Sequence, residues 1–219
     1  MEREIDMKEV SDGRFYGLRD MVRADCGGCQ GCSDCCRGMG SSIVLDPYDV
    51  FRLTTGLGRS FEQLLEKEIE LNLVEGIVLP NLKMTGPRDQ CSFLNEEGRC
   101  RIHPFRPGMC RMFPLGRYYE NESFQYFLQV HECKKEPKTK VKVQKWIDTP
   151  EPKKNEAFII EWHYFLKALS RRLEHTEKGS FQKSLSMYLL NAFYRKPYEK
   201  DKSFYEQFEE RMAEARKLS

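Results

Sequence analysis

The stretch that decides the fold is Cys26–Cys36, which reads C-G-G-C-Q-G-C-S-D-C-C. It holds five of the nine cysteines of the chain, and its glycines favour a tightly curled loop over a helix or strand. The other cysteines are Cys91, Cys100, Cys110 and Cys133, so all nine fall in the first 133 of 219 residues. This distribution predicts a metal-holding module followed by a part of the chain without thiols.

The cysteine spacing indicates metal binding. Cys26, Cys29, Cys32 and Cys35 are each separated by two residues, a step that brings two sulfurs close enough to share a metal or a cluster edge. The first residues lack the apolar core of a signal peptide, and no apolar run is long enough to span a membrane. We therefore expect a cytoplasmic protein, in which thiols stay reduced and an odd number of clustered cysteines favours metal over disulfides.

The choice of metal stays open at this point. The steps from Cys26 through Cys29 and Cys32 to Cys36 have the spacing of a bacterial ferredoxin run, which favours a [4Fe–4S] cluster. Arg37, however, stands where such a run has proline. Neighbouring side chains diverge, so the adjacent pair Cys35-Cys36 more easily serves two centres, and two four-cysteine zinc sites remain the alternative.

Composition limits the partners that the chain would bind. With 36 basic and 34 acidic side chains the net charge is +2, which gives no drive towards nucleic acid or anionic lipid. A hydrophobic content of 40% is enough for a packed core. The partner that we expect is a protein redox partner or substrate.

The lysine- and proline-rich segment divides the chain into a metal-binding module at 1–133, a basic connector at 134–155 and a helical part at 156–219.

The rest of the pattern predicts an α+β fold. Residues 1–25 are expected to contain a short helix, and two hairpins are expected, over 91–103 with a turn at 95–98, and over 115–130 with a turn at Asn121-Glu122. Two helices should lie between the cysteine loop and the first hairpin. Apolar residues at helical spacing predict three helices at the end of the chain, from Glu156, Ser180 and Ser203.

Four motifs, in order, carry a resemblance to a known family. They are Cys29-x2-Cys32-x2-Cys35-Cys36, Cys91-x-Phe93-Leu94, Gly98-x-Cys100-x-Ile102 and Arg106-Pro107-x2-Cys110-Arg111-x-Phe113-Pro114. The chain resembles the CxxCxxCC (YkgJ-like) cysteine-cluster family, a zinc- or iron-chelating group, over about half its length. Cys26 lies outside the pattern. The resemblance implies eight metal ligands, namely Cys29, Cys32, Cys35, Cys36, Cys91, Cys100, Cys110 and Cys133.

The resemblance also bears on function. Flagellin lysine methyltransferases carry a related cysteine cluster associated with an iron–sulfur centre, which favours iron–sulfur over zinc. We therefore expect a centre used in electron transfer or in a redox or methyl-transfer reaction. The alternatives are a non-enzymatic zinc-stabilised module and a metal carrier. Arg106 and Arg111 are expected beside the cofactor, offsetting thiolate charge, and His103 and His131 are further ligand candidates. No catalytic residue is identified, so the sequence does not decide whether the protein is an enzyme.

Overall fold

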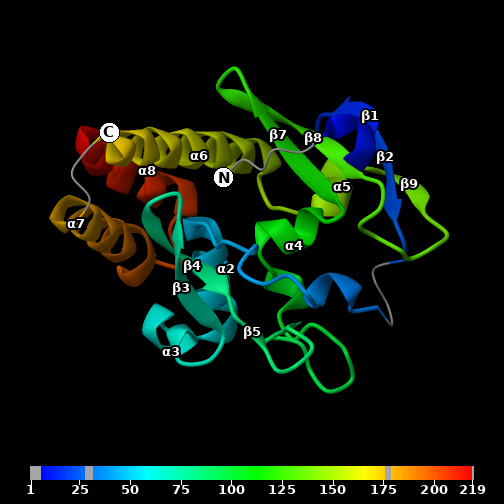
Figure 1. Cartoon of the computed structure of the whole chain (residues 1–219), viewed down its shortest axis with the longest axis horizontal. Helices are drawn as coiled ribbons and strands as arrows, with labels where there is room; N and C mark the ends of the chain where they lie inside the picture. Colours follow the sequence, from blue (N-terminus) through cyan, green and yellow to red (C-terminus); the bar gives the residue numbers. More distant parts are fainter. Residues whose placement is uncertain (1–5, 28–31, 176–178, 219) are drawn as a thin grey trace.

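The fold is α+β, as predicted. A computed structural model describes residues 6–27, 32–175 and 179–218. Figure 1 shows helices α6, α7 and α8 towards one side and strands β1, β2, β7, β8 and β9 towards the other. No helix in the described ranges has both the length and the apolar character needed to cross a membrane. Within the residues described, the strands form four small antiparallel sheets with the orders β1-β8-β7, β2-β9, β3-β4 and β5-β6.

The elements follow one another in short segments over the first two thirds of the chain. The strands are β1 Ser11–Tyr16, β2 Met21–Asp25, β3 Ile69–Val74, β4 Ile77–Leu82, β5 Met84–Thr85, β6 Gln90–Cys91, β7 Leu115–Glu120, β8 Ser123–Gln129 and β9 Thr139–Lys142. The helices are α1 Met7–Val10, η1 Asp34–Cys36, α2 Pro47–Leu57, α3 Phe61–Leu65, η2 His103–Phe105, α4 Gly108–Met112 and α5 Val143–Ile147. The three expected C-terminal helices are α6 Pro152–Glu174, α7 Ser180–Leu189 with its extension η3 Leu190–Arg195, and α8 Phe204–Ala215 followed by η4 Arg216–Leu218.

The C-terminal helices share one hydrophobic core with the middle of the chain. The apolar faces of α6, α7, η3 and α8 are buried together with side chains of α2, β3 and β4. Aromatic rings meet edge to face in this core, with the centroids of Phe158 and Phe208 4.7 Å apart. The Tyr194 hydroxyl donates a hydrogen bond of 3.1 Å to the carbonyl of Leu45, which joins η3 to the segment before α2. The helical part is therefore packed on the cysteine-bearing part.

A second, smaller core lies between the N-terminal strands and the expected connector. The N-terminal stretch was expected to hold a helix, and α1 is one short helical turn, but strands β1 and β2 follow it before the cysteine-rich loop. Strand β2 pairs with β9, and Val22, Val141, Val143 and Ile147 are buried together. The segment expected as a connector thus contains a strand and a helix that pack. The division of the chain into three parts stays a prediction.

The two expected hairpins differ in outcome. The hairpin of β7 and β8 is confirmed, with Asn121 and Glu122 both at positive φ in its turn. The hairpin over 91–103 is confirmed only as a tight turn closed by a bridge between Leu94 and Cys100. Strand β6, which contains Cys91, pairs instead with β5. The Asn95 side chain accepts from the Arg99 amide at 2.7 Å, so the turn is stabilised locally without a longer ladder.

Candidate metal centre

Six cysteines from separate segments line one cavity of about 1170 Å³. They are Cys32, Cys35 and Cys36 around η1, Cys91 in β6, Cys100 after the tight turn and Cys110 in α4. All eight cysteines in the described part of the chain are thiols. Cys29 falls in residues 28–31, outside the described residues. The structure therefore gathers six of the eight predicted ligands around one space.

The loop that carries Cys35 and Cys36 is clamped onto the turn between β5 and β6. Arg37 bridges to Gln90 in the antiparallel sense, and its guanidinium donates to the Gln90 side-chain oxygen at 2.9 Å. Gly38 donates its amide to the Asp89 carbonyl at 2.8 Å. Because Cys91 follows Gln90 directly, these contacts fix the position of Cys91 relative to Cys36.

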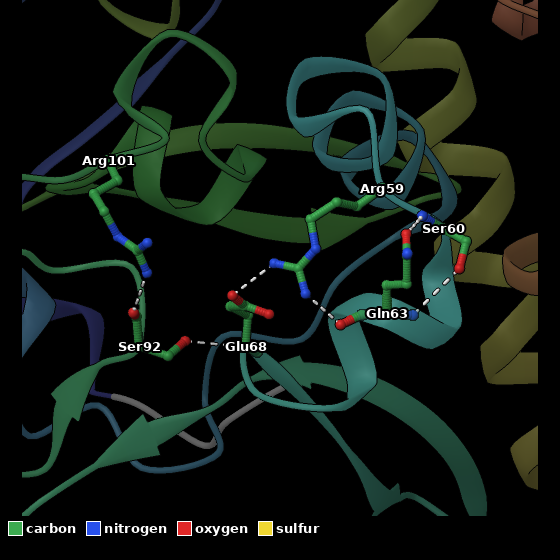
Figure 2. A network of polar contacts seen from close by, with 6 residues as sticks. All are labelled: Arg59, Ser60, Gln63, Glu68, Ser92 and Arg101. Carbon is green, nitrogen blue, oxygen red and sulfur yellow. Dashed lines mark hydrogen bonds and ion pairs between the residues drawn. The ribbon is translucent and has the colours of Figure 1, made fainter.

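A polar network also holds the segment between Cys91 and Cys100 (Figure 2). Glu68 is buried and pairs with Arg59 at 2.7 Å, while its carbonyl accepts from the Ser92 hydroxyl at 3.0 Å. Arg101 in turn donates to the Ser92 carbonyl at 2.9 Å. The residues next to Cys91 and Cys100 are thus tied to each other and to the start of β3.

The short helix α4, which carries Cys110, is held by a buried carboxylate. Asp49 of α2 accepts a hydrogen bond of 2.7 Å from the Gly108 amide at the start of α4. The guanidinium of Arg111, 4% exposed, lies 5.9 Å from the ring centroid of Tyr48 and donates to the carbonyl of Arg106 at 2.8 Å. Asp49 itself is 2% exposed. These contacts orient α4 so that Cys110 faces the cavity.

The thiols are close enough to influence one another. The Cys35 thiol takes part in a hydrogen bond with that of Cys36, and this contact and burial raise the pKa of Cys35. Burial, together with the neighbouring Cys91, Asp49, Cys35 and Cys100, raises the pKa of Cys110 well above its usual range. Burial is also the main cause of the raised pKa of Cys91 and of Cys100. Crowded thiolates repel one another, so a bound cation would stabilise the deprotonated set.

Backbone amides are already aimed at two of the sulfurs. The Phe93 amide donates to the sulfur of Cys91, and the Ile102 amide donates to that of Cys100, which lowers the pKa of each thiol against the effect of burial. Such N–H groups stabilise thiolate charge. Arg106 lines the cavity and also favours the thiolates of Cys35 and Cys100.

The donor chemistry fits a thiophilic metal. Thiolates suit zinc, copper(I) and iron–sulfur clusters, and amide donors and a guanidinium offset their charge here. Across the described ranges, no three His, Cys, Asp or Glu side chains converge closely enough to form a preformed site for a single ion. The thiols instead surround a space from several sides.

The two predicted arginines occupy different positions. Arg106 lies beside the cysteines, and its guanidinium is 2.8 Å from the ring nitrogen of His103. Burial and the charges of Arg106 and Arg99 lower the pKa of His103. Arg111 is part of α4 and does not line the cavity, and its guanidinium instead donates to the carbonyl of Arg106. His131 lines the cavity too. That Arg106 and Arg111 bind a cofactor stays a prediction.

Cys133 does not itself line the cavity, although His131 and Glu132 just before it do. Its thiol takes part in a hydrogen bond with the thiol of Cys26, which the sequence pattern leaves outside the ligand set. Burial raises the pKa of Cys133, opposed by the Lys135 amide and the Lys138 ammonium. The role of Cys133 as a metal ligand stays a prediction.

The sequence did not reveal the acidic residues of the cavity wall. Asp46 and Asp49 both line the cavity, and burial, with the neighbouring Asp49, raises the pKa of Asp46 to about 7. They form a capping box at the start of α2, in which each side chain accepts from the other residue's amide. The available signal was Asp46-Pro47 followed by Asp49, a spacing of acidic residues that is typical of a helix N-terminus.

The comparisons with known proteins place the motifs in a family. The match to the CxxCxxCC family covers residues 28–146, more than half of the 219-residue chain. Neither the curated proteins nor the solved structures contain a match. The matched range includes every cavity cysteine as well as Cys133, and begins after Cys26. The chain therefore belongs to the CxxCxxCC family, whose domain is described as a "putative zinc- or iron-chelating domain".

Proposed function

We propose that this chain binds an iron–sulfur centre, of the [4Fe–4S] type, in the cavity lined by its cysteines. The observation that carries the proposal is that thiols from four separate segments line one space. The ligands would come from the set Cys32, Cys35, Cys36, Cys91, Cys100 and Cys110, with Cys29 and Cys133 as the further predicted ligands. When bound, such a centre would supply one-electron chemistry.

The protein's own residues would set the properties of the centre. The amides of Phe93 and Ile102 and the guanidinium of Arg106 would offset thiolate charge, which raises the reduction potential of a cluster. The apolar side chains around the cavity would exclude water from one side of it. The proposed role is electron transfer with a protein partner, or a redox or methyl-transfer reaction on a substrate in the same cavity.

The test is an anaerobic preparation analysed for iron, acid-labile sulfide and paramagnetic resonance. We expect brown protein with iron and sulfide in comparable amounts. Cys36→Ala and Cys110→Ala should lose the metal, whereas the matched control Cys26→Ala should keep it. Colourless protein with stoichiometric zinc and no sulfide would refute the iron–sulfur proposal. Full metal content in Cys110→Ala would remove the ligand assignment.

The second candidate is a zinc-stabilised binding module without enzymatic activity. It is favoured by the turn between Cys91 and Cys100, where each sulfur accepts from the amide two residues later, as expected for thiolates held by a single ion. This candidate predicts a redox-silent protein whose structure loosens when a chelator removes zinc. Circular dichroism of chelator-treated protein distinguishes the two, because the zinc module should lose ordered structure.

A further inference from the structure

The cavity that holds the cysteines continues well beyond them. Its wall also includes Leu115 and Phe127 from strands β7 and β8, and Ile159, Trp162 and Leu166 from helix α6. Its volume of about 1170 Å³ exceeds the range of about 300–1,000 Å³ that is common for small-molecule sites. A metal centre at the cysteines therefore leaves room for a second occupant. We call the part lined by these five apolar residues the apolar arm.

A charged side chain also lines this cavity and lies close to the cysteine-bearing helix α4. Arg117 belongs to β7, and its Nη2 atom is 3.7 Å from the position that a Cβ would occupy at Gly108, the first residue of α4. The same short helix carries Cys110. The Nε atom of Arg117 is buried and has no hydrogen-bond partner among the described residues. The guanidinium is thus partly desolvated near one of the proposed metal ligands.

The protein does not balance the charge of Arg117 with an ion pair. In the part of the chain that the structure describes, no carboxylate lies within ion-pair distance of this side chain. The nearby carboxylates of Asp46 and Asp49 instead accept hydrogen bonds from backbone amides. The groups within hydrogen-bonding reach of the guanidinium are the neutral hydroxyls of Tyr119 and Tyr126. A guanidinium without a counter-ion at a cavity wall is suited to bind an anion.

We propose that the cavity binds an organic monocarboxylate with an apolar or aromatic body, whose carboxylate is held by Arg117 and whose body lies in the apolar arm. A carboxylate matches the planar donor fork of a guanidinium. Asp46 and Asp49 also line the cavity and would repel a dianion such as a phosphate ester, so a single negative charge fits better.

The aromatic residues of the cavity support the same class of ligand. The rings of Tyr119 and His163 both line the cavity and lie nearly parallel, with centroids 3.6 Å apart. Together with Trp162 they offer an aromatic wall against which a flat ring can pack. The inference rests on the proposed function only for a reaction of the ligand at the metal centre, since binding itself requires the cavity and Arg117.

The experiment titrates metal-loaded full-length protein with phenylacetate, phenylacetamide and phenyl phosphate, and measures each affinity by isothermal titration calorimetry. Phenylacetate should bind about tenfold or more tightly than phenylacetamide, because the amide keeps the body but carries no charge for the guanidinium. Phenyl phosphate should bind more weakly than phenylacetate. Absence of phenylacetate binding, or equal affinities for the carboxylate and the amide, would overturn the inference. Tighter binding of phenyl phosphate would overturn the choice of a monocarboxylate.

Two substitutions locate the site. Arg117→Met should weaken phenylacetate binding by about tenfold or more. Arg195→Met is the control, because Arg195 is an exposed arginine outside the cavity, and it should leave the affinity unchanged. Leu166→Trp keeps the guanidinium but fills the apolar arm, so it should also weaken binding. Thermal unfolding checks that each variant is folded, and unchanged affinity in either folded cavity variant would overturn the inference.

Metal content separates this inference from the proposed function. Arg117→Met and Leu166→Trp should keep the metal content of the unsubstituted protein, because neither residue supplies a thiol. Absence of metal from the unsubstituted protein would refute the proposed function. The preference for phenylacetate over phenylacetamide would then still decide whether the cavity binds a carboxylate.

Discussion

Replacing Asp49 by alanine is expected to destabilise the protein and to loosen the metal centre at Cys110. One Asp49 oxygen accepts the Gly108 amide at 2.7 Å, and the other accepts the Asp46 amide at 3.3 Å. The first bond joins α2 to the start of α4, across 59 residues of sequence. Alanine removes both acceptors and leaves the Gly108 amide buried without a partner.

The magnitude follows from these two contacts. A buried donor left without an acceptor costs about 1–3 kcal/mol. The bond to the Asp46 amide is long, and its loss adds about 0.5 kcal/mol. Against this, burial raises the pKa of Asp49, so the native state accommodates the carboxylate at a cost that alanine removes. We therefore expect the free energy of unfolding to fall by about 2 kcal/mol.

The assay is denaturant unfolding of Asp49→Ala, with Asp49→Asn as the matched control. Asparagine keeps a carbonyl oxygen for the Gly108 amide and removes the buried charge, so its stability should lie within about 1 kcal/mol of the unsubstituted protein. Metal content should follow the same order, because α4 carries Cys110. Equal stability and equal metal content in the two variants would refute the reasoning, since the Gly108 hydrogen bond would then not be the important contact.

Three further predictions concern packing, protonation and metal removal. A Cβ at Gly56 would lie 2.6 Å from the ring of Phe105, so Gly56→Ala should lower stability by about 1–3 kcal/mol, measured by thermal unfolding. Burial raises the pKa of the Asp46 carboxyl to about 7, so the folded state favours the protonated form of this group. The contribution of this protonation to the free energy of unfolding is complete below about pH 4 and is lost as the pH rises through 7. Asp46→Asn keeps the helix cap and should show no such loss when unfolding curves of the two proteins are compared from pH 4 to 8. Chelation should make Cys110 alkylate faster than in the metal-loaded protein, as read by mass spectrometry.

The sequence predicted the elements whose signals are local. The three C-terminal helices could be predicted because apolar side chains such as Phe158, Leu185 and Phe208 recur at helical spacing, and these residues are buried. The hairpin turn at Asn121-Glu122 could be predicted because asparagine adopts positive φ readily. Both turn residues have positive φ in the structure.

The remaining parts depend on partners far away in the chain. Strands β1 and β2 lie in a charged stretch and pair with β8 and β9, more than a hundred residues later, so no local pattern marked them. For the same reason, the contact between the thiols of Cys26 and Cys133 could not be predicted from the sequence. The sequence did not single out Asp49, because its hydrogen bond to Gly108 exists only once α2 and α4 pack.

The hydrophobic core and the proposed metal centre are linked by the residues two positions after Cys91 and Cys100. Phe93 follows Cys91, is 1% exposed and lies in the main core, while its amide donates to the cysteine sulfur. Ile102 has the same relation to Cys100 and the same exposure. The side chains that anchor these two segments therefore also fix the direction of each N–H–sulfur bond, so the core holds both sulfurs in place before a metal binds. At Cys133 the corresponding amide is that of Lys135, which likewise opposes the effect of burial on the pKa of the thiol.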